Sequence, residues 1–85
     1  MSVTLQLFGA FREHAREGRV ALDIARPATV GELRRALDAH AREHWPGYRP
    51  QLLAVSAFAS SSEVLRDADP LPDGELALLP PVSGG

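Results

Sequence analysis

One helix decides the fold class of this sequence, and it is encoded in the stretch TVGELRRALDAHA, residues 29–41. Thr29 stands three residues before Glu32, which is the spacing of a capping box at a helix N-terminus. Apolar side chains follow at helical spacing, at Val30, Leu33, Leu37 and Ala41. Pro46 and Gly47 stop the helix near Trp45. The stretch therefore predicts one amphipathic helix with a single apolar face to bury.

Two strands are predicted before this helix. Residues 2–8 and residues 19–24 alternate apolar and polar side chains, a pattern typical of half-buried strands. The predicted buried positions are Val3, Leu5, Leu7, Val20, Leu22 and Ile24. A short charged connection, residues 9–18, joins the two strands, so we expect them to pair antiparallel.

Three further strands are predicted after the helix. Leu52–Phe58 is mainly apolar, Glu63–Leu65 is a short fourth strand, and Glu75–Leu79 is the last one. The last strand can pair beside the first in the same direction through a crossover connection. The result is an α+β fold of the β-grasp, or ubiquitin-like, type, a mixed sheet of four to five strands with one main helix across it. Another small α+β sandwich is the alternative.

Composition limits the function. The 85 residues allow one domain, which we assign to residues 1–80, with residues 81–85 as a flexible tail. The chain has no cysteine, which excludes disulfides, thiolate metal sites and a catalytic thiol.

The net charge of −2 argues against nucleic acid as a partner. No apolar run reaches the roughly 18 residues of a membrane span, and no signal peptide is recognised, so we expect a cytoplasmic protein.

The tail is the main functional candidate. It reads Pro80-Pro81-Val82-Ser83-Gly84-Gly85. Two prolines end sheet pairing because neither has an N–H to donate, and glycine lacks the Cβ that would keep its backbone out of a narrow channel. Such a tail can present the carboxylate of Gly85 to the active site of another protein, where adenylation would make it an acyl donor and a sulfur nucleophile could turn it into a thiocarboxylate. A frayed end without a role is the alternative.

The tail and the residues before it resemble the MoaD family, the small subunit of molybdopterin synthase. The resemblance covers Leu78–Gly85 with Leu71–Ala77, the opening run Val3–Glu13 and the helix start Thr29–Leu33. It implies that an adenylating enzyme uses ATP to activate Gly85 and that a sulfur donor then converts Gly85 to a thiocarboxylate. Pro80, Pro81, Val82, Ser83 and Gly84 would insert into the large subunit, where sulfur is transferred to a pterin precursor of the molybdenum cofactor.

The resemblance also implies the partners. These are the molybdopterin synthase large subunit, in an assembly of two small and two large subunits, and the adenylating, sulfur-loading enzyme. The small subunit is not catalytic alone and binds no cofactor, since ATP is used by the activating enzyme. Three alternatives remain open: a sulfur carrier for thiamine, cysteine or tRNA thiolation, a ubiquitin-like modifier joined through Gly85 to target lysines, and a plain interaction domain with an idle tail.

Two further patterns bear on partner surfaces and on metals. Phe8, Phe58 and Leu79 are expected to form a sheet face that the helix leaves uncovered and that docks the large subunit; completing the core is their alternative role. His40 and His44 match the pattern H-x-x-E-H, but a catalytic zinc needs a third protein ligand and a cleft, so we predict surface histidines and no metal.

One stretch departs from the MoaD pattern. That family often has an Asn at the hairpin after the third strand, where this chain has serines within Ser56–Ser62. Serine tolerates left-handed backbone angles less well than Asn. We therefore expect the departure to affect the geometry of this hairpin rather than the chemistry of the tail.

Overall fold

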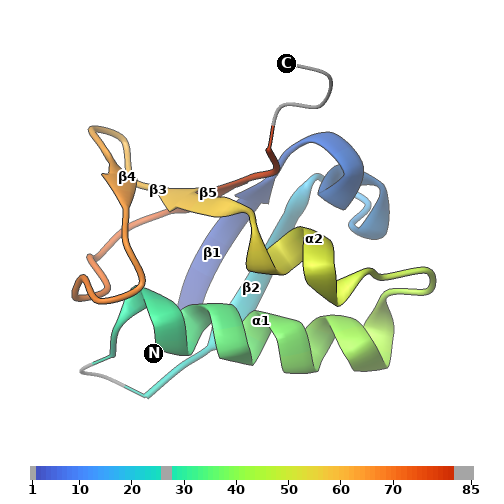
Figure 1. Cartoon of the computed structure of the whole chain (residues 1–85), viewed down its shortest axis with the longest axis horizontal. Helices are drawn as coiled ribbons and strands as arrows, with labels where there is room; N and C mark the ends of the chain where they lie inside the picture. The colour runs from blue at the N-terminus through green and yellow to red at the C-terminus, as the bar shows by residue number, and fades with distance from the viewer. Residues whose placement is uncertain (1, 26–27, 82–85) are drawn as a thin grey trace.

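The structure, a computed structural model, describes residues 2–25 and 28–81. Figure 1 shows a twisted sheet with one long helix lying across one of its faces. The elements, in chain order, are β1 (Ser2–Leu7), the 3₁₀ helix η1 (Gly9–His14), β2 (Arg19–Asp23), α1 (Val30–His44), α2 (Pro50–Ala54), β3 (Ala57–Ala59), β4 (Val64–Leu65) and β5 (Leu76–Leu79). Within the described residues, no helix is long and apolar enough to cross a membrane.

The sheet has the strand order β2-β1-β5-β3-β4. β1 pairs antiparallel with β2 and parallel with β5, in a register that sets Leu7 beside Leu78. β3 pairs antiparallel with both β4 and β5. The first and last strands thus lie side by side in the middle of the sheet, which confirms the predicted β-grasp fold.

α1 begins where the sequence predicts, at a complete capping box. The Glu32 backbone N–H donates to Thr29 Oγ1 at 3.2 Å, and the Thr29 backbone N–H donates to Glu32 Oε1 at 3.0 Å. The loop before β5 adds a second cap, since the backbone N–H of Gly31 donates to the carbonyl of Asp67 at 2.9 Å. These bonds satisfy helix N–H groups that have no partner within the helix.

The core lies between α1 and the sheet. Its fully buried large side chains are Phe11, Phe58, Leu5, Leu7, Leu33, Leu37, Leu53, Leu76, Leu78, Val3 and Val30. The apolar stripe predicted for the helix and the alternation predicted for β1 both face this core. Phe11 is added from η1, so the connection between the first two strands also packs inward.

The prediction of one strand over Leu52–Phe58 is wrong. The chain forms α2 from Pro50 to Ala54, and β3 begins only at Ala57. Proline suits the first turn of a helix because its missing N–H would have no partner there. The side chain of Ser56 helps to end α2, since its hydroxyl donates to the carbonyl of Leu52 at 2.6 Å.

The serine-rich hairpin between β3 and β4 is closed by Ser60. Its backbone N–H donates to the carbonyl of Glu63 at 2.9 Å, and its hydroxyl accepts from the N–H groups of Ser62 and Glu63, each at 3.3 Å. None of the described residues other than glycine has a positive φ angle. Because the turn uses no left-handed residue, serine serves it without the conformational freedom of Asn.

Candidate functional site

The candidate site is the place where the chain leaves the sheet after β5. The strand ends at Leu79, which pairs with Ala57 of β3, and Pro80 and Pro81 follow outside the sheet ladder. Pro80 is half-buried and Pro81 is exposed. The other predicted tail residues, Val82, Ser83, Gly84 and Gly85, lie outside the described residues. The structure therefore fixes the origin of the tail.

The start of η1 lies next to this exit (Figure 1). β1 and β5 run in the same direction, and continuing their register by one residue from Leu7 and Leu78 places Phe8 beside Leu79. Gly9 follows Phe8 and lies against the ring of Pro80, because a Cβ built on Gly9 would come within 2.7 Å of Pro80 Cγ. Residues from opposite ends of the sequence thus meet where the tail begins.

An apolar patch surrounds the exit, and we call Phe8, Leu79 and Pro80 the exit patch. Phe8 is 40% exposed, an unusual value for a large apolar side chain. Leu79 and Pro80 are half-buried. Two of the three residues predicted for the partner surface, Phe8 and Leu79, therefore lie together beside the tail.

The prediction that Phe58 belongs to this surface is wrong. Its side chain has an exposed fraction of 0% and lies in the core. Phe58 pairs with Leu78, whereas Ala57 pairs with Leu79. Successive residues of a strand point to opposite faces of the sheet. Phe58 therefore shares the helix-facing side with Leu78, and only small alanines stand beside it on the open face.

Charged side chains lie on the open face at the start of β5. The amide of Gln6 donates to Glu75 Oε1 at 2.7 Å, and Arg19 Nη1 lies 3.9 Å from Glu75 Oε2. These three residues join β1, β2 and the loop before β5. Because β5 runs from this end toward Leu79, the polar group and the exit patch occupy successive parts of the same face.

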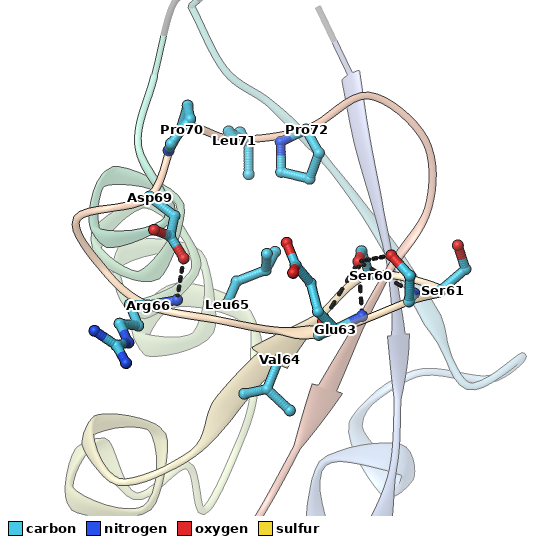
Figure 2. A pocket seen from close by; sticks show the side chains of 11 residues that line it. Ser60, Ser61, Glu63, Val64, Leu65, Arg66, Asp69, Pro70, Leu71 and Pro72 are labelled. Carbon is cyan, nitrogen blue, oxygen red and sulfur yellow. Dashed lines mark hydrogen bonds between the residues drawn. The ribbon is translucent and has the colours of Figure 1, made fainter.

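A hollow of about 720 Å³ lies between the β3–β4 hairpin and the loop before β5, and the side chains that line it are drawn in Figure 2. Two of its polar side chains hold these loops: Ser60 makes the hairpin bonds given above, and the Asp69 carboxylate accepts from the backbone N–H of Arg66 at 2.8 Å. Ser60 follows Ala59, which pairs with Ala77 at the start of β5, so the hollow lies at the end of the sheet away from Leu79. It does not form part of the tail exit.

The histidines gather around Trp45 at the end of α1. His14 stacks on Trp45 with ring centroids 4.8 Å apart, and the rings of His40 and His44 lie 4.6 Å apart. Burial, and then the nearby His44, lower the pKa of His40. Among residues 2–25 and 28–81, no three His, Cys, Asp or Glu side chains are grouped so that they could hold a metal ion. Of the two histidines in the H-x-x-E-H pattern, His40 is half-buried against Trp45 and His44 is exposed.

Comparison with known proteins places this fold and exit in a family. The sequence model of the ThiS family matches residues 5–85. The chain belongs to the ThiS family. The match extends through both prolines to Gly85, so the tail is part of what the chain shares with other ThiS family members.

Three similar proteins cover nearly the whole length of the chain. It is 39% identical, over 99% of its length and 97% of the relative's, to the molybdopterin synthase sulfur carrier subunit of Synechococcus elongatus. SAMP1 of Haloferax volcanii is 30% identical with a TM-score of 0.65, and 100% of both chains is covered. A chain from the complex of subunits 1 and 2 of the molybdopterin-converting factor of Helicobacter pylori is 28% identical with a TM-score of 0.57, again over 100% of both chains.

Sequence reasoning assigned no role to Gly9. Gly9 was included only in the run Val3–Glu13 that resembles the MoaD family and in the charged connection 9–18 between two strands. Gly9 is the second residue after β1 and Pro80 is the first after β5, so the two lie level in the parallel register of these strands. This relationship can be read only once the register of β1 and β5 is known.

Proposed function

We propose that this chain is a sulfur carrier whose terminal glycine, Gly85, is adenylated and converted to a thiocarboxylate that donates sulfur to a pterin precursor in molybdopterin synthesis. The observation that carries the proposal is the similarity, over nearly the whole length of both chains, to a protein named as a molybdopterin synthase sulfur carrier subunit. The absence of cysteine supports it, because sulfur carried by this chain cannot travel on a side-chain thiol.

The chemistry follows from the reactivity of a carboxylate. The Gly85 carboxylate attacks the α-phosphate of ATP in the activating enzyme, and pyrophosphate leaves. Sulfide supplied by the sulfur donor then attacks the carbonyl carbon of the acyl adenylate and AMP leaves. Loss of the S–H proton gives the thiocarboxylate. The sulfur nucleophile and any general base belong to the partners, so this chain contributes the reacting carboxylate and its delivery.

The large subunit of molybdopterin synthase is the acceptor-side partner in this proposal. A similar chain was solved within a complex of two subunits of the molybdopterin-converting factor. In our chain the exit patch offers apolar contact next to the point where the tail starts, which suits a partner that must hold the body while it receives the tail. We extend this to an assembly of two small and two large subunits.

The experiment has two stages. The chain is first loaded with its adenylating enzyme, ATP and a sulfur donor, and its intact mass is measured for replacement of one oxygen by sulfur. The loaded chain is then mixed with the large subunit and the pterin precursor. We expect sulfur to appear in the pterin and the carrier to return to its carboxylate form.

The second stage separates the alternatives. A carrier of another pathway would load but leave the pterin unchanged. A protein modifier would instead appear in isopeptide linkage to lysines of other proteins. Transfer of sulfur to the pterin contradicts both, whereas a chain that loads and never transfers contradicts the molybdopterin assignment.

A further inference from the structure

Gly9 is the described glycine at which an added Cβ would come nearest to another residue, and that residue is Pro80. Gly9 has a φ of 57°, and a Cβ built on it would lie 2.7 Å from Pro80 Cγ. Carbon atoms are in optimal contact at about 3.5–4.0 Å. The ring of Pro80 therefore occupies space that a side chain at position 9 would need.

Other glycines with positive φ provide the comparison. Gly47 has a φ of 76° and Gly74 a φ of 95°, and a Cβ on either would meet nothing within 4 Å. A Cβ on Gly18 would meet only the flexible side chain of Arg12, at 3.4 Å. Four described glycines thus have a left-handed backbone conformation. Only at Gly9 would an added Cβ clash with a proline ring.

The Gly9 side of this contact is held firmly. The Leu7 backbone N–H donates to the carbonyl of Gly18 at 2.7 Å, which closes the connection on which η1 lies. Phe11 is buried and packs near Trp45, with ring centroids 6.4 Å apart. His14 stacks on the same Trp45. Since η1 is anchored to the end of α1, a side chain at position 9 would displace Pro80 rather than η1.

The Pro80 side of the contact leads directly into the tail. The ring of proline includes its own backbone nitrogen and Cα, so moving the ring moves the main chain. Pro80 stands five residues before Gly85, which corresponds to a reach of roughly 17 Å for an extended chain. Phe8, the exposed member of the exit patch, directly precedes Gly9. A change at position 9 therefore alters the path of the tail relative to the surface that a partner would hold.

We propose that Gly9 is a positioning residue for the chemistry at Gly85: its missing side chain lets Pro80 lie against η1 and so sets the direction in which the tail leaves the sheet. This inference rests on the proposed function. It explains why a glycine stands beside the exit, and it assigns to η1 the role of a fixed support for the tail.

The test compares Gly9→Ala with Gly47→Ala in the full chain. Both substitutions place alanine in the left-handed region at a similar backbone cost. Only the first brings a Cβ against Pro80. Thermal unfolding and the kcat and KM for sulfur loading are measured with the adenylating enzyme, ATP and sulfur donor. We expect similar losses in melting temperature, but a fall of about tenfold in kcat for Gly9→Ala alone, since small misplacements of reacting groups have large effects on rate.

Two more variants separate the collision from backbone strain. Gly9→Asn carries the same Cβ but tolerates left-handed angles better than alanine, so it keeps the chain folded if Gly9→Ala does not. We expect Gly9→Asn to load slowly as well. In a chain that already carries Pro80→Ala, the ring is gone, and we expect Gly9→Ala to slow loading far less than it does beside Pro80.

The outcomes are distinct. Loading by Gly9→Ala at the rate of Gly47→Ala overturns the inference and leaves the proposed function intact. An unchanged effect of Gly9→Ala in the Pro80→Ala background also overturns it, because the ring would then not be the cause. A wild-type chain that takes up no sulfur removes the proposed function and this inference with it.

Discussion

The guanidinium of Arg34 lies over the ring of Phe58, with its central carbon 5.0 Å from the ring centroid. The same guanidinium donates to the carbonyls of Leu53 and Ser56, at 2.6 and 2.7 Å, and to Asp67 Oδ1 at 2.9 Å. One side chain of α1 thus joins α2, the start of β3 and the loop before β5. Arg34 thus covers the ring of Phe58 on the helix-facing side of the sheet.

Replacing Arg34 should destabilise the fold. Arg34→Ala leaves two carbonyls and a carboxylate without their charged donor, and we expect the free energy of unfolding to fall by about 2–4 kcal/mol. Arg35→Ala is the matched control, because Arg35 is the next residue of α1 and is exposed; its effect should stay within about 0.5 kcal/mol. Urea unfolding of both variants checks this, and equal losses would contradict the bridging role of Arg34.

The burial of Phe58 gives a second prediction. Phe58→Ala opens a cavity in the core and should cost about 3–5 kcal/mol. Phe8→Ala removes a ring that is 40% exposed, and we expect a loss below about 1 kcal/mol. Both are measured by urea unfolding. A small effect at Phe58 would mean that this ring is not part of the core.

The exit patch gives a third prediction. Phe8→Asp should leave the free energy of unfolding nearly unchanged but weaken binding to the molybdopterin synthase large subunit by about tenfold or more, because a charge would be buried against an apolar partner surface. Val64→Asp is the control, since Val64 is 66% exposed and lies on the edge strand β4. Binding is followed by calorimetry, and equal affinity for both variants would show that Phe8 lies outside the contact.

The hydrogen bond between Tyr48 and Asp38 gives a prediction about pH. The Tyr48 hydroxyl donates to Asp38 Oδ1 at 2.6 Å. This bond, with a second one from Arg42, lowers the pKa of Asp38, and burial together with the bond to Asp38 raises the pKa of Tyr48. For Asp38 the stabilisation is present above the ordinary carboxyl pKa near 4 and is lost as the pH falls through the lowered value. For Tyr48 it is present below about pH 10 and is lost as the pH rises toward the raised value.

The measurement is simple because Tyr48 is the only tyrosine in the chain. Tyrosinate absorbance should rise with a midpoint above the ordinary pKa of about 10 while circular dichroism still reports a folded chain. Tyr48→Phe should be less stable than wild type by about 1 kcal/mol at neutral pH, and the gap should narrow in acid. Ionisation of Tyr48 at its ordinary pH in the folded chain would contradict the bond.

Much of the fold could be predicted because its local and tertiary signals agree. Thr29 and Glu32 formed the capping box that the sequence indicated, and the apolar stripe of α1 matched a sheet whose strands alternate. The parallel pairing of the first and last strands followed from the order of the elements alone. In each case a local motif, a periodic pattern or the order of the elements pointed to one structure.

The errors concern short segments that tertiary contacts decide. The run Leu52–Phe58 is apolar enough for a strand, yet its first part is a single helical turn that Arg34 holds by the carbonyls of Leu53 and Ser56. Arg34 lies 19 and 22 positions away from these residues, so no local pattern reports it. Phe58 is a core residue because it pairs with Leu78 on the helix-facing side of the sheet. The contact of Gly9 with Pro80 could not be predicted either, because these residues are also far apart in the sequence.

The central claim is that sulfur travels on the main-chain carboxyl of Gly85, and tandem mass spectrometry of the loaded chain tests it most directly. The chain is incubated with its adenylating enzyme, ATP and a sulfur donor, beside a variant that ends at Gly84. We predict that one oxygen is replaced by sulfur, that the fragment carrying this change contains Gly85, and that the shortened chain stays unmodified. Sulfur located elsewhere in the chain, or equal loading of the shortened chain, would contradict the account.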